Sequence, residues 1–265
     1  MILFIEGTSD NYNSANRTYR RSICTVVAMI SDGKTAIPVT HNFWISEEFA
    51  LENYKTKTEI AKALTEAVMK HLRFFMVLAD GLYATHELLK WMSERNIRFE
   101  MKFHSNRSIV FNGTTISVKN HPLLQLKKTR KRQTIATEWN GIFLYITVVT
   151  RYTKNDEKVV IFQASNYKTS ARDHERFYKY RWAIEKFFRT AKQKLGIGDC
   201  QARSMNSQKN HIMNVFLAYV ILQLERKKLR LKNVETVLRR IRRKSYTDII
   251  NSLTRSDQIF GVIYA

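Results

Sequence analysis

The chain has 265 residues, 44% of them hydrophobic, which is enough for one large domain or two small ones with a sizeable core. Its 45 Lys and Arg outnumber 23 Asp and Glu, and the net charge of +22 indicates a nucleic-acid partner, with a ribosomal protein or a solvated basic surface as alternatives. Two cysteines exclude a disulfide framework, and the apolar runs at 74–79 and 142–149 are too short to span a bilayer, so a cytoplasmic protein without a membrane partner is expected.

The first part of the chain has the pattern of a mixed α/β fold. Five short apolar and β-branched runs predict strands. These runs lie at 2–5, 22–30, 34–40, 75–79 and 97–103. Apolar residues at helical spacing predict two helices, at 58–74 and 85–96. Three hairpin strands followed by strand–helix–strand units are typical of a mixed α/β sheet.

The pattern changes between residues 106 and 166. Helical periodicity is lost there, and apolar runs separated by Asn-Gly and Asn-Asp turn signals predict an antiparallel β-strand insertion. Its predicted strands lie at 108–111, 115–118, 134–138, 142–150 and 159–163. Beyond it, helical spacing predicts three helices, at 172–195, 207–228 and 234–244.

These patterns predict four segments along the chain. They are the first part of a core at 1–105, the β-strand insertion at 106–166, a helix that completes the core at 167–200, and a C-terminal helical region at 201–265. The insertion also carries a basic run, for which we predict contact with nucleic acid. The run consists of Lys127, Lys128, Arg130, Lys131 and Arg132.

One polar stripe stands out on the predicted helix at 172–195. Tyr178, Arg181, Glu185 and Lys192 are spaced by three, four and seven residues, so they fall within an arc of roughly 60° on an ideal helix. A row of salt bridges, such as Arg181 with Glu185, would have the same spacing and would contribute only about 0.2–0.5 kcal/mol per pair. Spacing alone favours this simpler explanation.

The identities of these residues match a known sequence signature. The sequence YKYRWAIEKFFRTAK resembles the YREK signature of the insertion-sequence-four family of bacterial DDE transposases, and Tyr178, Arg181, Glu185 and Lys192 match it at every position. Upstream, VLADGLYATHELL resembles the second catalytic block of that family, with Asp80 as its carboxylate. The resemblance covers nearly the whole chain and implies an RNase H-like core. The N-terminal DNA-recognition region usual in such transposases is missing, so an N-terminally truncated protein is expected.

The first acidic position departs from the family. The strand reads LFIEGTSD, which places Glu6 where the family has Asp. The resemblance implies that Glu6, Asp80 and Glu185 together hold two Mg²⁺ or Mn²⁺ ions, since these hard cations prefer carboxylate oxygens. Each residue also has an ordinary explanation, Asp80 as a turn residue and Glu6 as a loop carboxylate. Because Glu is one methylene longer than Asp, we expect impaired activity, with a DNA-binding or inhibitory remnant as the alternative function.

The resemblance also implies a reaction and its partners. The reaction is metal-dependent cleavage of DNA at element ends, followed by transfer of the freed 3′-hydroxyl to target DNA. A dimer is expected in the DNA complex, in a bacterial cytoplasm and associated with the nucleoid. Tyr178, Arg181 and Lys192 are assigned to DNA handling. Trp139 is predicted either to stack an unpaired base or to fill a hairpin core, and Trp182 is expected in the core.

Overall fold

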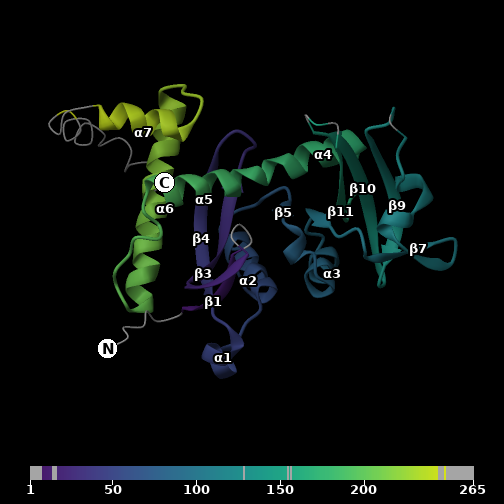
Figure 1. Ribbon diagram of the computed structural model, residues 1–265, viewed down its shortest axis with the longest axis horizontal. Helices are drawn as coiled ribbons and strands as arrows, with labels where there is room; N and C mark the ends of the chain where they lie inside the picture. Colours follow the sequence, from purple (N-terminus) through teal and green to yellow (C-terminus); the bar gives the residue numbers. More distant parts are fainter. Residues whose placement is uncertain are drawn as a thin grey trace.

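A mixed β-sheet and a long kinked helix, whose first half lies on the sheet and whose second half extends beyond it, organise the molecule in the computed structural model (Figure 1). The structure describes residues 8–13, 17–127, 129–153, 155, 157–243 and 248. The sheet has the strand order β5 (Val77–Ala79), β6 (Phe99–Phe103), β11 (Lys158–Ser165), β10 (Ile142–Tyr152) and β9 (Arg132–Trp139). Only β5 and β6 are parallel, and the other neighbours are antiparallel. The predicted mixed α/β, RNase H-like fold class is thereby confirmed.

Three strands of the predicted insertion continue the same sheet as β5 and β6. β11 pairs directly with β6, so β9, β10 and β11 extend the sheet. The remaining two strands, β7 (Ser108–Phe111) and β8 (Thr114–Ser117), form a hairpin of their own. All five strands predicted within 106–166 are present, whereas the division of the chain into four segments stays a prediction.

A separate antiparallel hairpin consists of β3 (Cys24–Ser31) and β4 (Ala36–Trp44). Its turn is fixed by Asp32, whose carboxylate accepts hydrogen bonds from the backbone N–H groups of Lys34 and Thr35 at 2.8 and 2.6 Å. Gly33 in this turn has a φ of +84° and faces Tyr180, and an added Cβ would lie 3.1 Å from the Tyr180 ring. The turn therefore needs glycine for its backbone conformation and for its close contact with the long helix.

Strand prediction failed only at the beginning of the chain. A short hairpin, β1 (Ser9–Asn13) with β2 (Thr18–Ser22), precedes β3 and is rich in polar residues, so it gave no apolar strand signal. The strand predicted at 2–5 lies outside the described residues.

Two helices follow the hairpin along the chain, one before the first strand of the sheet and one between its first two strands. α2 (Lys57–Met69) starts with a capping box, in which Thr56 accepts from the Glu59 N–H and the Glu59 carboxylate accepts from the Thr56 N–H. α3 (His86–Glu94) links β5 to the parallel strand β6 and buries four residues against the sheet. Short helical segments lie at α1 (Glu47–Ala50), η1 (Leu51–Asn53), η2 (Gly81–Tyr83), η3 (Val118–Asn120) and η4 (Pro122–Leu124).

Side chains along β6 alternate between the two faces of the sheet, which α3 and α4 cover from opposite sides. Phe99, Met101 and Phe103 belong to the main hydrophobic core, which also holds the buried side chains of α3. Glu100 points to the other face, where it meets α4. This alternation is the period of two expected for a strand that is covered on both sides.

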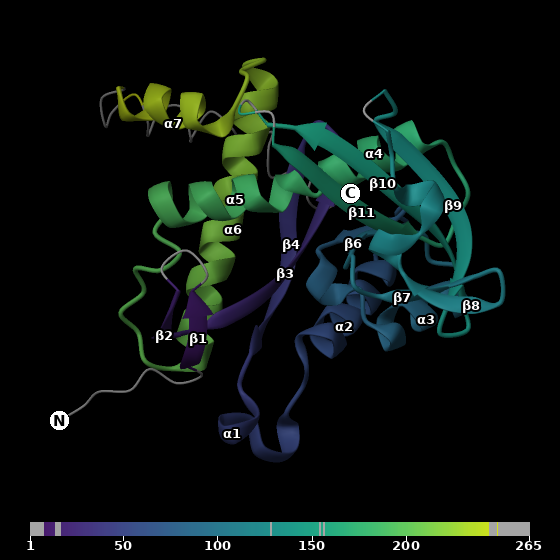
Figure 2. The ribbon, with the colours of Figure 1, turned by 45° about the vertical axis from the view of Figure 1, so that its right-hand side comes forward.

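The helix predicted at 172–195 is divided into α4 (Ala171–Tyr180) and α5 (Trp182–Lys194). At the junction, the Arg181 N–H donates to the Tyr178 carbonyl and the Ile184 N–H to the Arg181 carbonyl, which are tighter i→i−3 bonds. α4 lies on the sheet, while α5 packs against β4 and α6 (Figure 2). The kink therefore lies where the helix leaves the sheet.

The C-terminal region completes a second core. α6 (Met205–Lys228) and α7 (Val234–Arg242) pack with α5 through Phe187, Phe216 and Val237. Arg226 on α6 donates to the Thr35 hydroxyl and so holds the tip of the β3–β4 hairpin. Within the described part of the chain, none of the helices is long and apolar enough to cross a membrane.

Candidate active site

Asp80 stands at the end of β5, where the chain leaves the sheet. Its exposed carboxylate accepts a hydrogen bond from the Gly81 N–H at 2.8 Å and caps the turn η2. An added Cβ on Gly81 would lie 3.0 Å from His104 Nε2 and 3.4 Å from the Lys102 carbonyl oxygen. The turn that carries Asp80 is therefore pressed against the end of the neighbouring strand β6.

Tyr178, Arg181 and Glu185 meet at the junction of α4 and α5. Arg181 Nη2 donates to Glu185 Oε1 at 2.6 Å, and the Arg181 guanidinium lies 5.3 Å from the centre of the Tyr178 ring. Arg181 is mostly buried, with 14% of its side chain exposed, whereas Glu185 is 37% exposed. The stripe predicted on the helix thus contains a real salt bridge, and its carboxylate still reaches solvent.

The electrostatics of the site connect Asp80 to this group. Burial raises the pKa of Tyr178 to about 12, and the negative charges of Asp80 and Glu185 add to the rise. For Arg181, burial alone would lower the pKa, but Tyr178, Glu185 and Asp80 raise it to a net increase. The strand β5, which ends next to Asp80, contacts α4, and the charges of both carboxylates influence the pKa of the same two side chains, although Asp80 and Glu185 are far apart in the sequence.

The sequence of this chain matches a known protein family. A family model described as the transposase DDE domain matches residues 47–221, which is more than half of the chain. The chain belongs to this family. The matched region includes Asp80 and the whole α4–α5 helix, so the two carboxylates lie within the DDE domain. Membership makes the protein a DDE transposase domain, with DNA as the substrate class and phosphodiester cleavage and joining as the chemistry. No curated protein sequence matches the chain.

Among the residues that the structure describes, the other predicted site residues make no hydrogen bond, ion pair or cation–π contact with Tyr178, Arg181 or Glu185, except Trp182, which lies beside Arg181. Lys192 is exposed on α5, and its Nζ lies 6.0 Å from the centre of the Phe188 ring. Glu6, the predicted first carboxylate, lies outside the described residues, and so does Lys128. In the basic run, Lys127, Arg130 and Lys131 are exposed, whereas Arg132 is paired with Glu175 on α4.

The two tryptophans differ from each other in exposure. Trp139 is 8% exposed and packs edge-to-face against Phe103 with ring centres 5.2 Å apart, which favours the prediction that it fills the core. Trp182 is 48% exposed, so the expectation that it is buried in the core is wrong. The kink at Arg181 explains this difference, because it places Trp182 between the part of the helix on the sheet and the part on α6.

A buried pair that was not predicted from the sequence joins α4 to the sheet. Glu100 Oε2 on β6 lies 2.6 Å from His174 Nδ1 on α4, and neither side chain is exposed. The Tyr167 hydroxyl donates to the same carboxylate oxygen at 3.2 Å. Burial raises the pKa of Glu100, while His174 and Tyr167 oppose the rise. No signal in the sequence marks this pair, because its two members are 74 residues apart.

The position of this pair shows what it does for the site. Glu100 is in register with Leu78, two residues before Asp80, and His174 lies one helical turn before Tyr178. The buried pair therefore fixes α4 on the strand next to the one that carries Asp80. His104 was also missed, although a histidine directly after a buried strand, at the same edge of the sheet as Asp80, is a signal that could have been used.

The donor chemistry of the site fits a hard divalent cation. Asp80 and Glu185 offer carboxylate oxygens with access to solvent, which are the ligands that Mg²⁺ and Mn²⁺ prefer. Within the described residues, no group of three or more His, Cys, Asp or Glu is placed to hold a metal ion. The described part of the site thus supplies two candidate carboxylates.

Proposed function

We propose that this DDE domain is a YREK-type transposase of the insertion-sequence-four family, which cleaves DNA at element ends and joins the freed ends to target DNA. One observation carries the proposal: α4 packs against β5, the strand that ends next to Asp80, and the charges of Asp80 and Glu185 raise the pKa of both Tyr178 and Arg181. A row of surface salt bridges would not account for Asp80, which comes from a strand end nearly a hundred residues away. A DNA substrate also agrees with the net charge of +22.

Asp80 and Glu185 would hold the metal ions, with Glu6 as the proposed third carboxylate. Two bound Mg²⁺ or Mn²⁺ ions would activate the attacking water and stabilise the leaving oxygen of an in-line displacement. Hydrolysis breaks the bond between phosphorus and the 3′ oxygen and releases a 3′-hydroxyl group. In the joining step, that hydroxyl attacks a phosphodiester of the target, whose own 3′ oxygen leaves.

Arg181 and Tyr178 have separate tasks in this proposal. Arg181 has five N–H donors and gives one to Glu185 at 2.6 Å, so other donors remain for a phosphate oxygen. With a pKa of about 12, Tyr178 remains a neutral phenol at physiological pH. We therefore assign it the role of a hydrogen-bond donor or packing group and not that of a base. The exposed indole of Trp182 lies beside this pair and is suited to stack an unpaired base.

The alternative is a catalytically impaired protein that binds DNA or inhibits an active transposase. The observation that favours it is Glu6, because its carboxylate would reach more than about 1 Å further than that of Asp, and displacement on this scale can cost roughly a hundredfold in rate. Lys192 and a dimeric DNA complex belong to the proposal through the family resemblance.

A nicking assay on supercoiled plasmid tests the proposal without knowledge of the element ends. We expect Mn²⁺-dependent nicking that falls by about a hundredfold or more in Asp80→Asn and in Glu185→Gln. Glu94→Gln and Glu138→Gln remove exposed carboxylates on α3 and β9 and should leave nicking unchanged. Nicking that persists in both site variants would overturn the assignment. If neither the natural protein nor Glu6→Asp nicks DNA, the impaired protein becomes the better description.

A further inference from the structure

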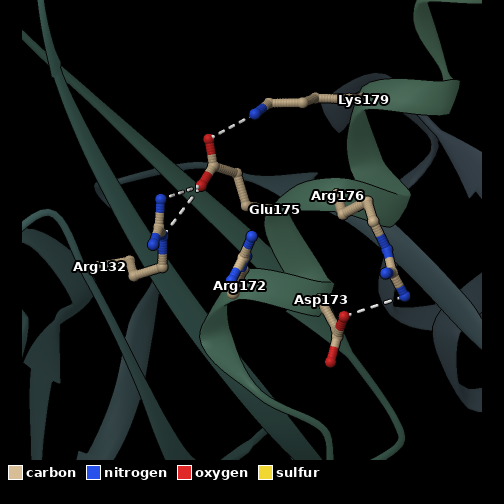
Figure 3. Close-up of a pocket in the computed structure, with 6 residues that line it drawn as sticks. All are labelled: Arg132, Arg172, Asp173, Glu175, Arg176 and Lys179. Carbon is tan, nitrogen blue, oxygen red and sulfur yellow. Dashed lines mark hydrogen bonds and ion pairs between the residues drawn. The ribbon is translucent and has the colours of Figure 1, made fainter.

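A charged hollow lies on α4 at the face turned toward β9. It has a volume of about 750 Å³ and a lining composed almost entirely of charged side chains (Figure 3). The lining residues are Arg132, Arg172, Asp173, Glu175, Arg176 and Lys179. We call this hollow the basic cup. The proposed reaction makes no use of it.

Glu175 organises the cations of the basic cup. This carboxylate is only 7% exposed and accepts from Arg132, Arg151 and Lys179, each at 2.8–2.9 Å. Burial alone would raise the pKa of Glu175, but Lys179, Arg151 and Arg132 lower it to a net decrease. The carboxylate therefore stays ionised and holds three cations from α4, β9 and β10 in fixed positions.

The cup keeps a surplus of positive charge. Four lining cations, Arg132, Arg172, Arg176 and Lys179, face two lining carboxylates, Asp173 and Glu175, which leaves a net charge of +2. Arg151 does not line the cup but pairs with Glu175 and adds one more positive charge beside it. Arg176 pairs with Asp173, while Arg172 makes no hydrogen bond or ion pair with any residue that the structure describes, and its guanidinium points into the hollow in Figure 3. Arg132 uses two of its nitrogens on Glu175, so a third remains for another acceptor.

The cup is separate from the candidate active site. At about 100° per residue, Arg172 and Arg181 point to opposite sides of the helix. Tyr178 and His174 face the sheet, whereas Arg172, Arg176 and Lys179 are exposed. A ligand in the cup would thus lie away from the phosphodiester that reacts at Asp80 and Glu185.

The surroundings of the cup indicate a polymer and not a single small anion. The Lys131 carbonyl accepts from the Thr150 N–H at 2.8 Å, which joins the exposed cations Arg130 and Lys131 to the rim next to Arg151. The lining has no aromatic ring on which a base could stack. A row of cations without base-recognising groups is the pattern of contacts to a phosphate backbone, which position DNA without reading its sequence.

We propose that the basic cup binds the phosphodiester backbone of a DNA segment other than the one being cleaved, and that Glu175 preorganises the cations for it. The inference rests on the proposed DNA substrate but not on cleavage. Because three cations are already held by Glu175, less side-chain freedom is lost when phosphate oxygens bind. Arg172, as the unpaired guanidinium, would make a direct contact.

Binding to a fluorescent 30-base-pair duplex of arbitrary sequence, measured without metal at several salt concentrations, tests the inference. The test variant is Arg172→Ala with Arg176→Ala, and the matched control is Lys70→Ala with Lys90→Ala, which removes two exposed cations from α2–α3. For the test variant we expect the log–log slope of the dissociation constant against salt to fall by about 1.8, since each phosphate contact contributes roughly 0.9. The control should keep the natural slope. Arg172→Ala alone, which breaks no described contact, should lower the slope by about 0.9.

Two results would overturn the inference. One is a slope for the test variant equal to that of the control. The other concerns protection of Arg172 and Arg176 from an arginine-specific reagent. If inorganic tripolyphosphate protects these two residues and duplex DNA does not, the ligand of the cup is a small polyanion. Plasmid nicking is measured separately, so its absence would count against the proposed function and not against the cup.

Discussion

The buried pair of Glu100 and His174 provides a sharp test of how the long helix is held on the sheet. The two groups lie 2.6 Å apart with no exposure to solvent. Removing one partner of such a pair leaves a buried group uncompensated and typically costs about 3–5 kcal/mol. Since a whole domain is stable by only about 5–15 kcal/mol, we expect His174→Ala to lower the free energy of unfolding by a large fraction. Urea denaturation measures this change.

A double-mutant cycle separates the pair from simple loss of packing. Replacing both members by apolar residues, as in Glu100→Met with His174→Leu, removes the buried polar groups together and should cost less than the sum of the single changes. Lys90→Ala serves as a control, because its pair with Glu94 is exposed and 4.0 Å long and should contribute less than about 1 kcal/mol. The pair does not stabilise the fold in this way if the free-energy costs of the two single changes add up in the double variant. The same conclusion follows if His174→Ala costs as little as the control.

The same variant has a defined pH dependence. Burial raises the pKa of Glu100, and His174 opposes that rise, so the pKa in His174→Ala should be raised further. A carboxyl group whose pKa is higher in the folded state gives stability that is present below its unfolded pKa and is lost as pH rises through the folded pKa. The destabilisation by His174→Ala should therefore be larger at pH 8 than at pH 5. A penalty that does not change with pH would contradict this account.

Three further predictions concern single positions. Glu6→Asp should raise Mn²⁺-dependent nicking, and adding Glu185→Ala should abolish the gain. Equal nicking by the natural protein and by Glu6→Asp would show that the site accommodates the longer Glu side chain. Gly81→Ala should lower nicking because its Cβ would lie 3.0 Å from His104 Nε2, and adding His104→Ala should restore nicking. If nicking is not restored, contact with His104 is not the cause of the loss. The pKa of Glu175 is lowered in the folded protein, so its ionised carboxylate gives stability that is present above the unfolded pKa and is lost as pH falls through the folded pKa. The urea midpoint should therefore fall more between pH 5 and pH 3 in the natural protein than in Glu175→Gln.

Local patterns in the sequence were sufficient for most of the fold. The apolar runs of β6 and β10 and the helical spacing of α2 and α6 depend on neighbours along the chain, so their periodicity is visible without a structure. The kink at Arg181 was not visible, because it arises where the helix passes from the sheet to α6. The exposure of Trp182 was mispredicted for the same reason.

In the candidate site, too, some residues were predictable from the sequence and others were not. Asp80 and Glu185 were predicted through their motifs, and their assignment as catalytic metal ligands stays a prediction. Their support was not predictable, because the Glu100–His174 pair and the carboxylate of Glu175 act across the fold. Buried polar pairs of this kind connect residues that are distant in the sequence, and each member alone looks like an ordinary charged residue.

Iron-directed backbone cleavage can show whether Asp80 and Glu185 bind the same metal ions. Fe²⁺ bound in place of Mg²⁺ produces hydroxyl radicals with ascorbate and peroxide, which cut the nearby chain. We expect cuts close to residues 80 and 185, competition by Mg²⁺ or Mn²⁺, and loss of both cuts in Asp80→Asn. Cuts that occur elsewhere, or that persist in Asp80→Asn, would contradict a shared metal site.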